Sequence, residues 1–195
     1  MISFLLNYPI KEILGILAGI VSSVAYIPYV SSIFTKKTKP SRSSWWIWSF
    51  IGLLILFSYR SVGAFNTIWV PVIFFIAPLI VAVLSLRFGE NTGLNSLDKI
   101  CLLGAAISII FWLLFNSAEV ALYINIFIDF LGYLPTLKKT FLNPFAESRL
   151  TWILFFLGSI LNVIAIDKFT LSIALYPAYM IAMDIVMLLL IFVKR

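Results

Sequence analysis

The chain has 195 residues, of which 63% are hydrophobic and 11% are charged, and this leaves too little polar surface to cover a water-soluble globule of that size. The composition therefore excludes an ordinary soluble domain and predicts an integral membrane protein embedded in a lipid bilayer. The formal net charge of +6 requires no nucleic-acid partner, because basic residues at the ends of membrane helices and their attraction to anionic lipid headgroups account for it.

Seven apolar runs follow one another along the chain. They cover residues 12–34, 45–63, 65–86, 97–116, 118–137, 150–166 and 169–193. Most approach the ~20 residues that a helix needs to cross ~30 Å of hydrocarbon. Because the runs are continuous rather than alternating, they favour helices over a β-barrel. We expect seven transmembrane helices.

A pattern at the junction of the first and second runs returns 107 residues later, at the junction of the fifth and sixth. The first copy is Tyr26-Ile27-Pro28 followed by Ser41-Arg42-Ser43-Ser44-Trp45, and the second is Tyr133-Leu134-Pro135 followed by Ser148-Arg149-Leu150-Thr151-Trp152. Further along, Pro71 in the third run corresponds to Pro177 in the seventh. A duplicated helical unit in an apolar chain indicates a membrane transporter built from two halves.

The repeat predicts two bundles of three helices, within residues 1–90 and 118–195, joined by a connector helix within residues 91–117. A single connector lets the second bundle enter the membrane in the same direction as the first. The predicted fold is therefore an all-α membrane protein with seven transmembrane helices, arranged as two parallel three-helix repeats around a connector (3+1+3).

The basic residues predict the orientation of the chain. Eleven of the fourteen lie after the first, third, fifth and seventh runs, and the exceptions are Lys11, Arg60 and Lys168. By the positive-inside rule, the C-terminus is expected in the cytoplasm and the N-terminus outside.

The chain lacks the residues on which several kinds of functional site depend. The chain has no histidine and a single cysteine, Cys101, so metal, haem and histidine-dependent acid–base sites lose their usual groups. No glycine-rich phosphate loop precedes a helix, which argues against an ATP-driven pump. We expect neither an enzyme nor a cofactor.

Four prolines are predicted hinges. Pro28 and Pro135 lie inside the first and fifth runs, where proline removes an amide donor and collides with the preceding turn. By the same reasoning, Pro71 and Pro177 are predicted hinges in the third and seventh runs. Paired hinges suit alternating access, whereas the alternative is a static kink that improves packing.

Two aspartates lie within apolar runs. Asp129 is flanked on one helical face by Asn125 and Tyr133, four residues to either side, and Asp184 lies in the seventh run. A carboxylate at the bilayer centre costs roughly 2.5–3.5 kcal/mol, so both should face the protein interior. They are predicted sites of coupling to protons or a monovalent cation. The alternatives are neutralisation by Arg60 or a loop lysine, and hydrogen bonds that hold helices together.

Other polar and aromatic residues are candidates for contact with a solute. These are Asn125, Asn162, Tyr26, Tyr133, Tyr176 and Tyr179, and hydrogen bonding between helices is the alternative role for the two asparagines. Trp45, Trp46, Trp48 and Trp152 are expected instead to anchor helices at the membrane interface.

Pro28, followed by Lys37-Thr38, Ser41 and Ser43, resembles the PQ-loop motif of the SWEET, cystinosin-like and KDEL-receptor group. The resemblance implies the same 3+1+3 topology with an outside N-terminus. The glutamine after the motif's proline is replaced by Tyr29 and Thr136. Val72 and Ala178 stand where sugar-carrying SWEET proteins have asparagine, so sugar specificity is not carried over.

Together these features predict a carrier that moves a small polar solute by alternating access, either facilitative or coupled to protons. The alternative is a non-transporting receptor on the same scaffold, as in the KDEL receptors. The two differ in that a sorting receptor should carry a luminal-facing basic pocket.

Overall fold

The computed structural model describes residues 10–36, 39–40, 42–89, 93–94 and 96–193. Within these ranges all regular structure is helical, as predicted, with seven α-helices, one short 3-10 helix and no strand. The helices are α2 (Ile10–Phe34), α3 (Arg42–Ser61), α4 (Trp69–Phe88), α5 (Ser96–Phe115), α6 (Ala118–Leu142), η1 (Pro144–Ala146), α7 (Arg149–Ile164) and α8 (Leu171–Val193).

The helices follow the seven apolar runs, with differences at their ends. The third run was expected to be helical from residue 65, but α4 begins at Trp69 because the preceding residues form turns that connect it to α3. The fifth run was expected to end at residue 137, but α6 continues through Pro135 to Leu142. The start of α7 is fixed by Ser148, whose hydroxyl accepts a hydrogen bond from the Thr151 amide at 3.4 Å.

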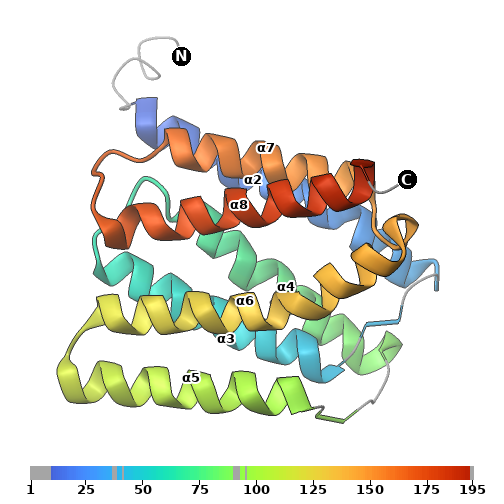
Figure 1. The fold of residues 1–195 in the computed structure, drawn as a ribbon, viewed down its shortest axis with the longest axis horizontal. Coiled ribbons are helices and arrows are strands. Elements are labelled where there is room, and N and C mark those ends of the chain that lie inside the picture. The colour runs from blue at the N-terminus through green and yellow to red at the C-terminus, as the bar shows by residue number, and fades with distance from the viewer. Residues whose placement is uncertain (1–9, 37–38, 41, 90–92, 95, 194–195) are drawn as a thin grey trace.

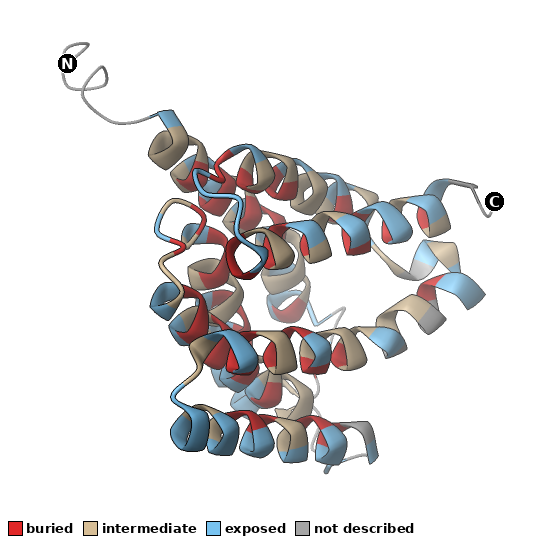
Figure 2. Ribbon diagram, turned by 60° about the vertical axis from the view of Figure 1, so that its left-hand side comes forward, coloured by how far each residue is buried: buried red, intermediate tan, exposed pale blue. Residues whose placement is uncertain are grey.

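Four of the helices, α2, α4, α5 and α8, are long and apolar enough to cross a membrane. The outer surface of the bundle is also apolar: Leu103, Leu113 and Leu114 on α5 are 64%, 79% and 72% exposed. Figure 2 shows the buried positions turned toward the inside of the bundle and the exposed ones toward the outside. An exposed apolar surface of this extent is suited to contact with lipid, so the chain is a helical membrane protein.

Successive helices run in opposite directions (Figure 1). The α2–α3, α4–α5 and α6–α7 connections and the C-terminal end of α8 therefore lie at one end of the bundle. We call it the basic end, because Lys36, Lys39, Arg42, Arg87 and Arg149 lie there. The α3–α4, α5–α6 and α7–α8 connections lie at the other end, called the opposite end.

We divide six of the helices by chain order into a first group, α2, α3 and α4, and a second group, α6, α7 and α8. In the first group α4 packs against both α2 and α3, and in the second α8 packs against both α6 and α7. The groups meet where α2 packs against α7 and where α3 packs against α6, while α5 lies against α6 and α3 at the edge of the bundle. The approach of α2 to the α3–α4 connection is so close that a Cβ atom on Gly15 would collide with the Asn66 carbonyl oxygen.

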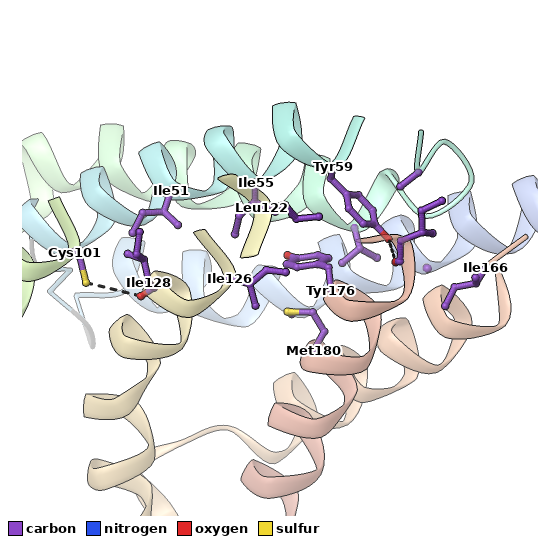
Figure 3. Close-up of a cluster of buried hydrophobic side chains, with 14 of the residues drawn as sticks. Ile51, Ile55, Tyr59, Cys101, Leu122, Ile126, Ile128, Ile166, Tyr176 and Met180 are labelled. Carbon is purple, nitrogen blue, oxygen red and sulfur yellow. Dashed lines mark hydrogen bonds between the residues drawn. The ribbon is translucent and has the colours of Figure 1, made fainter. Parts of the chain in front are cut away.

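A cluster of buried side chains extends along the bundle, from Ile47 and Cys101 nearer the basic end to Tyr59 and Ile166 at the opposite end (Figure 3). At the opposite end, the Tyr59 hydroxyl of α3 donates to the Ile173 carbonyl of α8 at 2.8 Å. The same hydroxyl shares a 2.7 Å hydrogen bond with Thr67, and its ring lies 5.5 Å from that of Tyr176. These contacts join the two groups of helices and close the bundle at this end.

Candidate functional site

A cavity of about 380 Å³ lies between the two groups of helices. Its lining comes from α2, α3 and α4 on one side and from α6, α7 and α8 on the other, with Glu147 from the segment between η1 and α7. The volume is in the range of pockets that hold small molecules. The cavity is therefore the candidate functional site.

The cavity extends toward the basic end. Its lining there, from the last turns of α2 and the first turns of α3 and α7, is half-buried, as at Tyr29, Ser44 and Thr151. Its inner lining is buried, as at Ile55, Tyr176 and Met180. Tyr176 also belongs to the buried cluster that extends to the opposite end, where its ring lies 5.5 Å from that of Tyr59. The cavity thus opens at the basic end and is closed at the other.

Asp129 lines the cavity from α6. Tyr179 of α8 donates its hydroxyl to Asp129 Oδ2 at 2.8 Å, and this hydrogen bond joins the first and third helices of the second group. In this bond the carboxylate is the acceptor. A partly buried carboxylate that faces a cavity can bind a proton or another cation there.

Asp184 lines the cavity from α8 and is 2% exposed. Ser159 of α7 donates its hydroxyl to Asp184 Oδ2 at 2.5 Å. The two aspartates predicted from the sequence therefore face one cavity, each with one oxygen held by a hydroxyl from a neighbouring helix.

Within the described part of the chain, neither Arg60 nor a loop lysine is found beside these acids, and the side chains of Lys37, Lys138 and Lys139 lie outside that part. The Arg60 guanidinium lies 5.8 Å from the ring of Phe65, at the opposite end. Among the described residues that line the cavity, none is a lysine or an arginine.

Aromatic rings form much of the cavity wall. The rings of Tyr26, Phe74 and Phe155 make a three-way cluster, with centroids separated by 5.2 to 5.8 Å, from α2, α4 and α7. Trp152 continues this wall from Phe155 to Tyr133. All four predicted tyrosines, Tyr26, Tyr133, Tyr176 and Tyr179, line the cavity.

Sequence reasoning missed three tryptophans in the lining. Trp45, Trp48 and Trp152 were expected to anchor helices at the membrane interface, but all three line the cavity. Only Trp46 has the exposed position expected of an anchor, at 43%. The indole of Trp48 reaches the cavity beside Gly132 of α6, where a Cβ atom would lie 2.7 Å from Trp48 Nε1. The repeat was the available signal, since Trp45 and Trp152 occupy equivalent positions beside the pocket tyrosines.

The two asparagines lie outside the cavity lining. Asn125 and Asn162 are fully buried, and neither amide has a hydrogen-bond partner among the described residues. Asn162 is one turn from Gly158, which contacts Ser22 of α2, so it lies on the side of α7 that packs against α2. With the helices packed in this way, neither asparagine can contact a solute in this cavity directly.

The predicted hinges differ in their positions. Pro28, Pro135 and Pro177 lie inside α2, α6 and α8, and the C-terminal part of α6 bends toward the start of α7 (Figure 1). Pro71 is the third residue of α4, in the first turn, where an amide has no partner within the helix. It therefore does not interrupt α4 as a mid-helix hinge would. The proline inside α4 is Pro78, which lines the cavity.

The arginines of the repeated pattern have a structural role beyond membrane orientation. Arg42 donates from Nε to the Ser85 carbonyl at 3.0 Å and from Nη2 to the Leu86 carbonyl at 2.9 Å, in the last turn of α4. Its counterpart Arg149 lies 5.4 Å from the ring of Phe192, near the end of α8. Each arginine thus links the second helix of its group to the end of the third. Lys37, Thr38 and Ser41 of the pattern lie outside the described residues.

No protein-family model, no curated protein and no solved structure matches this chain.

Proposed function

We propose that the chain is a membrane carrier that moves a small polar solute by alternating access. The observation that supports this most is the cavity between the two groups of helices, which is open at the basic end and closed at the opposite end by the Tyr59 cluster. A carrier needs a central binding site that is closed at one end at a time, so that the two ends open in turn.

We also propose that the two groups are parallel repeats joined by α5, with all seven α-helices crossing the membrane. In support, the first helix of each group packs against the second helix of the other: α2 packs against α7, and α6 packs against α3. A two-fold axis between the groups would relate these two contacts. In both groups the third helix lies between the first and second. A 3+1+3 topology is also what the resemblance to the PQ-loop proteins implies.

The basic end is assigned to the cytoplasm by the positive-inside rule. The N-terminus is then outside, and the cavity as described here faces the cytoplasm. Asp129 and Asp184 are the proposed sites of coupling to protons or a monovalent cation, because they are the two aspartates that face the cavity.

The proposal can be tested without knowing the solute. Met180 lines the inner part of the cavity, and Cys101 is the single cysteine of the chain, so Met180→Cys in a Cys101→Ala background carries one thiol at the site. In oriented membrane vesicles, a membrane-impermeant maleimide is expected to label this thiol from either side. Lys39→Cys and Lys168→Cys, both exposed and at opposite ends, are the controls for sidedness.

Alternating access predicts that reagent added on either side reaches Met180→Cys, while each control is labelled from one side only. Labelling of Met180→Cys from the basic end alone would contradict a carrier. That result would instead favour the non-transporting receptor, in which the opposite end stays closed.

A further inference from the structure

The cavity is unusual in its charge. Asp129 and Asp184 face it, and no described lining residue is basic. Two carboxylates in a low-dielectric space that no described lysine or arginine lines are stabilised by a positive partner. A proton is one such partner, and a positively charged ligand is another.

Aromatic side chains make up much of the rest of the lining. A metal ion such as Ca²⁺ takes six to eight oxygen ligands, and within the described residues no cluster of three acidic, histidine or cysteine side chains could hold one. An ammonium group on an organic molecule has a weaker demand for oxygen ligands and is attracted to the faces of tryptophan and tyrosine rings.

The carboxylates come from one group of helices, whereas the rings come from both. Asp129 and Asp184 lie on α6 and α8 of the second group, and the rings that face them from the first group are those of Tyr26, Trp45, Trp48 and Phe74. A molecule with a charged end and an apolar body could therefore contact carboxylates with one part and rings with the other.

We infer that the cavity binds a small organic cation, such as an amine or a quaternary ammonium compound. Its charged group interacts with Asp129 and Asp184, and its apolar body packs against the aromatic wall. The inference rests on the proposed function, because it names the class of solute for the same site.

The test uses three probes of similar shape and different charge: 2-phenylethylamine, 2-phenylethanol and 3-phenylpropionate, which are cationic, neutral and anionic at neutral pH. Binding to the purified full-length protein is followed by the fluorescence of the cavity tryptophans and by the melting temperature. We expect 2-phenylethylamine to bind about tenfold more tightly than 2-phenylethanol. The anionic probe, 3-phenylpropionate, should bind more weakly than either.

Two variants separate the site from the rest of the chain. Asp129→Asn keeps the shape of the side chain and removes its charge. The ratio of the affinity for 2-phenylethylamine to that for 2-phenylethanol should therefore fall toward one. Asp167→Asn makes the same change at an exposed aspartate outside the cavity and should leave the preference intact. The wild-type protein alone already gives a decisive answer, should Asp129→Asn fail to fold.

The inference would be overturned if 2-phenylethanol or 3-phenylpropionate bound as tightly as 2-phenylethylamine or more tightly. It would also be overturned if none of the three probes bound. Binding of the amine that is unchanged in Asp129→Asn would also overturn it, because the cation would then lie elsewhere. Failure of the proposed function is seen separately. Labelling of Met180→Cys from one side only would contradict the carrier while leaving cation binding in place.

Discussion

At the scale of single residues, the cavity is asymmetric although the sequence pattern around it is repeated. Tyr26 and Tyr133 are equivalent and both line the cavity, as do Trp45 and Trp152. The counterpart of Asp129 in the first group is Ser22, which lies against Gly158 of α7 instead of facing the cavity. The aromatic residues thus follow the repeat, whereas the negative charge belongs to one half.

Asp129→Asn tests the role of this charge in transport. A carboxamide cannot take up and release a proton, so uptake driven by a pH gradient is expected to be abolished, while the protein stays folded and still exchanges solute. The measurement is uptake and counterflow in proteoliposomes, with a substrate found by a thermal-shift screen of sugars, amino acids, vitamins and amines. Wild-type proton coupling in the variant would rule out Asp129 as the proton site.

At the scale of helices, close packing of α2 against the α3–α4 connection depends on a missing side chain. A Cβ atom at Gly15 would meet the Asn66 backbone oxygen, which cannot move without displacing the α3–α4 connection. At Gly104 of α5, by contrast, it would meet only the side chain of Ile128, at 2.9 and 3.0 Å.

Gly15→Ala is therefore expected to destabilise the protein by about 1–3 kcal/mol or more, as overpacking does in other cores. Gly104→Ala is the matched control and should cost less, because a flexible side chain can rotate away. Thermal or denaturant unfolding in detergent measures both. An equal loss of stability in the two variants would show that the contact of α2 with the α3–α4 connection is not especially tight.

Movement of helices is proposed to depend on the prolines inside α2 and α6. Pro135→Ala restores an amide donor to α6 and should stiffen it, so that the carrier is held in one facing state. Solute binding should be retained and transport strongly reduced, with a milder loss in Pro28→Ala. Unchanged transport in both single variants and in the double variant would reduce these prolines to packing features.

At the scale of the whole molecule, the closed end is held by few polar contacts between the groups. The Tyr59 hydroxyl bridges α3 and the Ile173 carbonyl of α8. A hydrogen bond of this kind contributes about 1 kcal/mol, so Tyr59→Phe should raise the population open at the opposite end about fivefold. The rate of maleimide labelling of Met180→Cys from that side should rise by the same factor. A rate that stays constant would show that apolar packing alone closes this end.

Much of the helical architecture could be predicted from the sequence, because continuous apolar runs and a repeated loop pattern depend on local sequence. The aspartates and tyrosines of the cavity could be predicted for a similar reason, since polar groups in apolar helices must face inward. The inward direction of Trp48 could not, because it depends on Gly132, which is distant in sequence and supplies the space for the indole.

Asn125 shows a second limit of sequence patterns. Residues four apart on a helix are offset by about 40°, so the stripe of Asn125, Asp129 and Tyr133 turns by about 80° over its length. Asp129 and Tyr133 line the cavity, and Asn125 lies beyond it in the buried interior. The first turn of α4, which includes Pro71, could not be distinguished from a helix interior, because the apolar run continues on both sides of it.

Tyr26 separates two environments. Its ring lines the central cavity, and it also lines an apolar groove on the outer surface between α2 and α4, beside the exposed Ile27 and Ile80. The barrier between the cavity and the outer surface is therefore one side chain thick at this point. Tyr26→Ala would join the two spaces and create a sideways entrance, through which the tails of brominated lipids should quench the cavity tryptophans more strongly than in the unaltered protein.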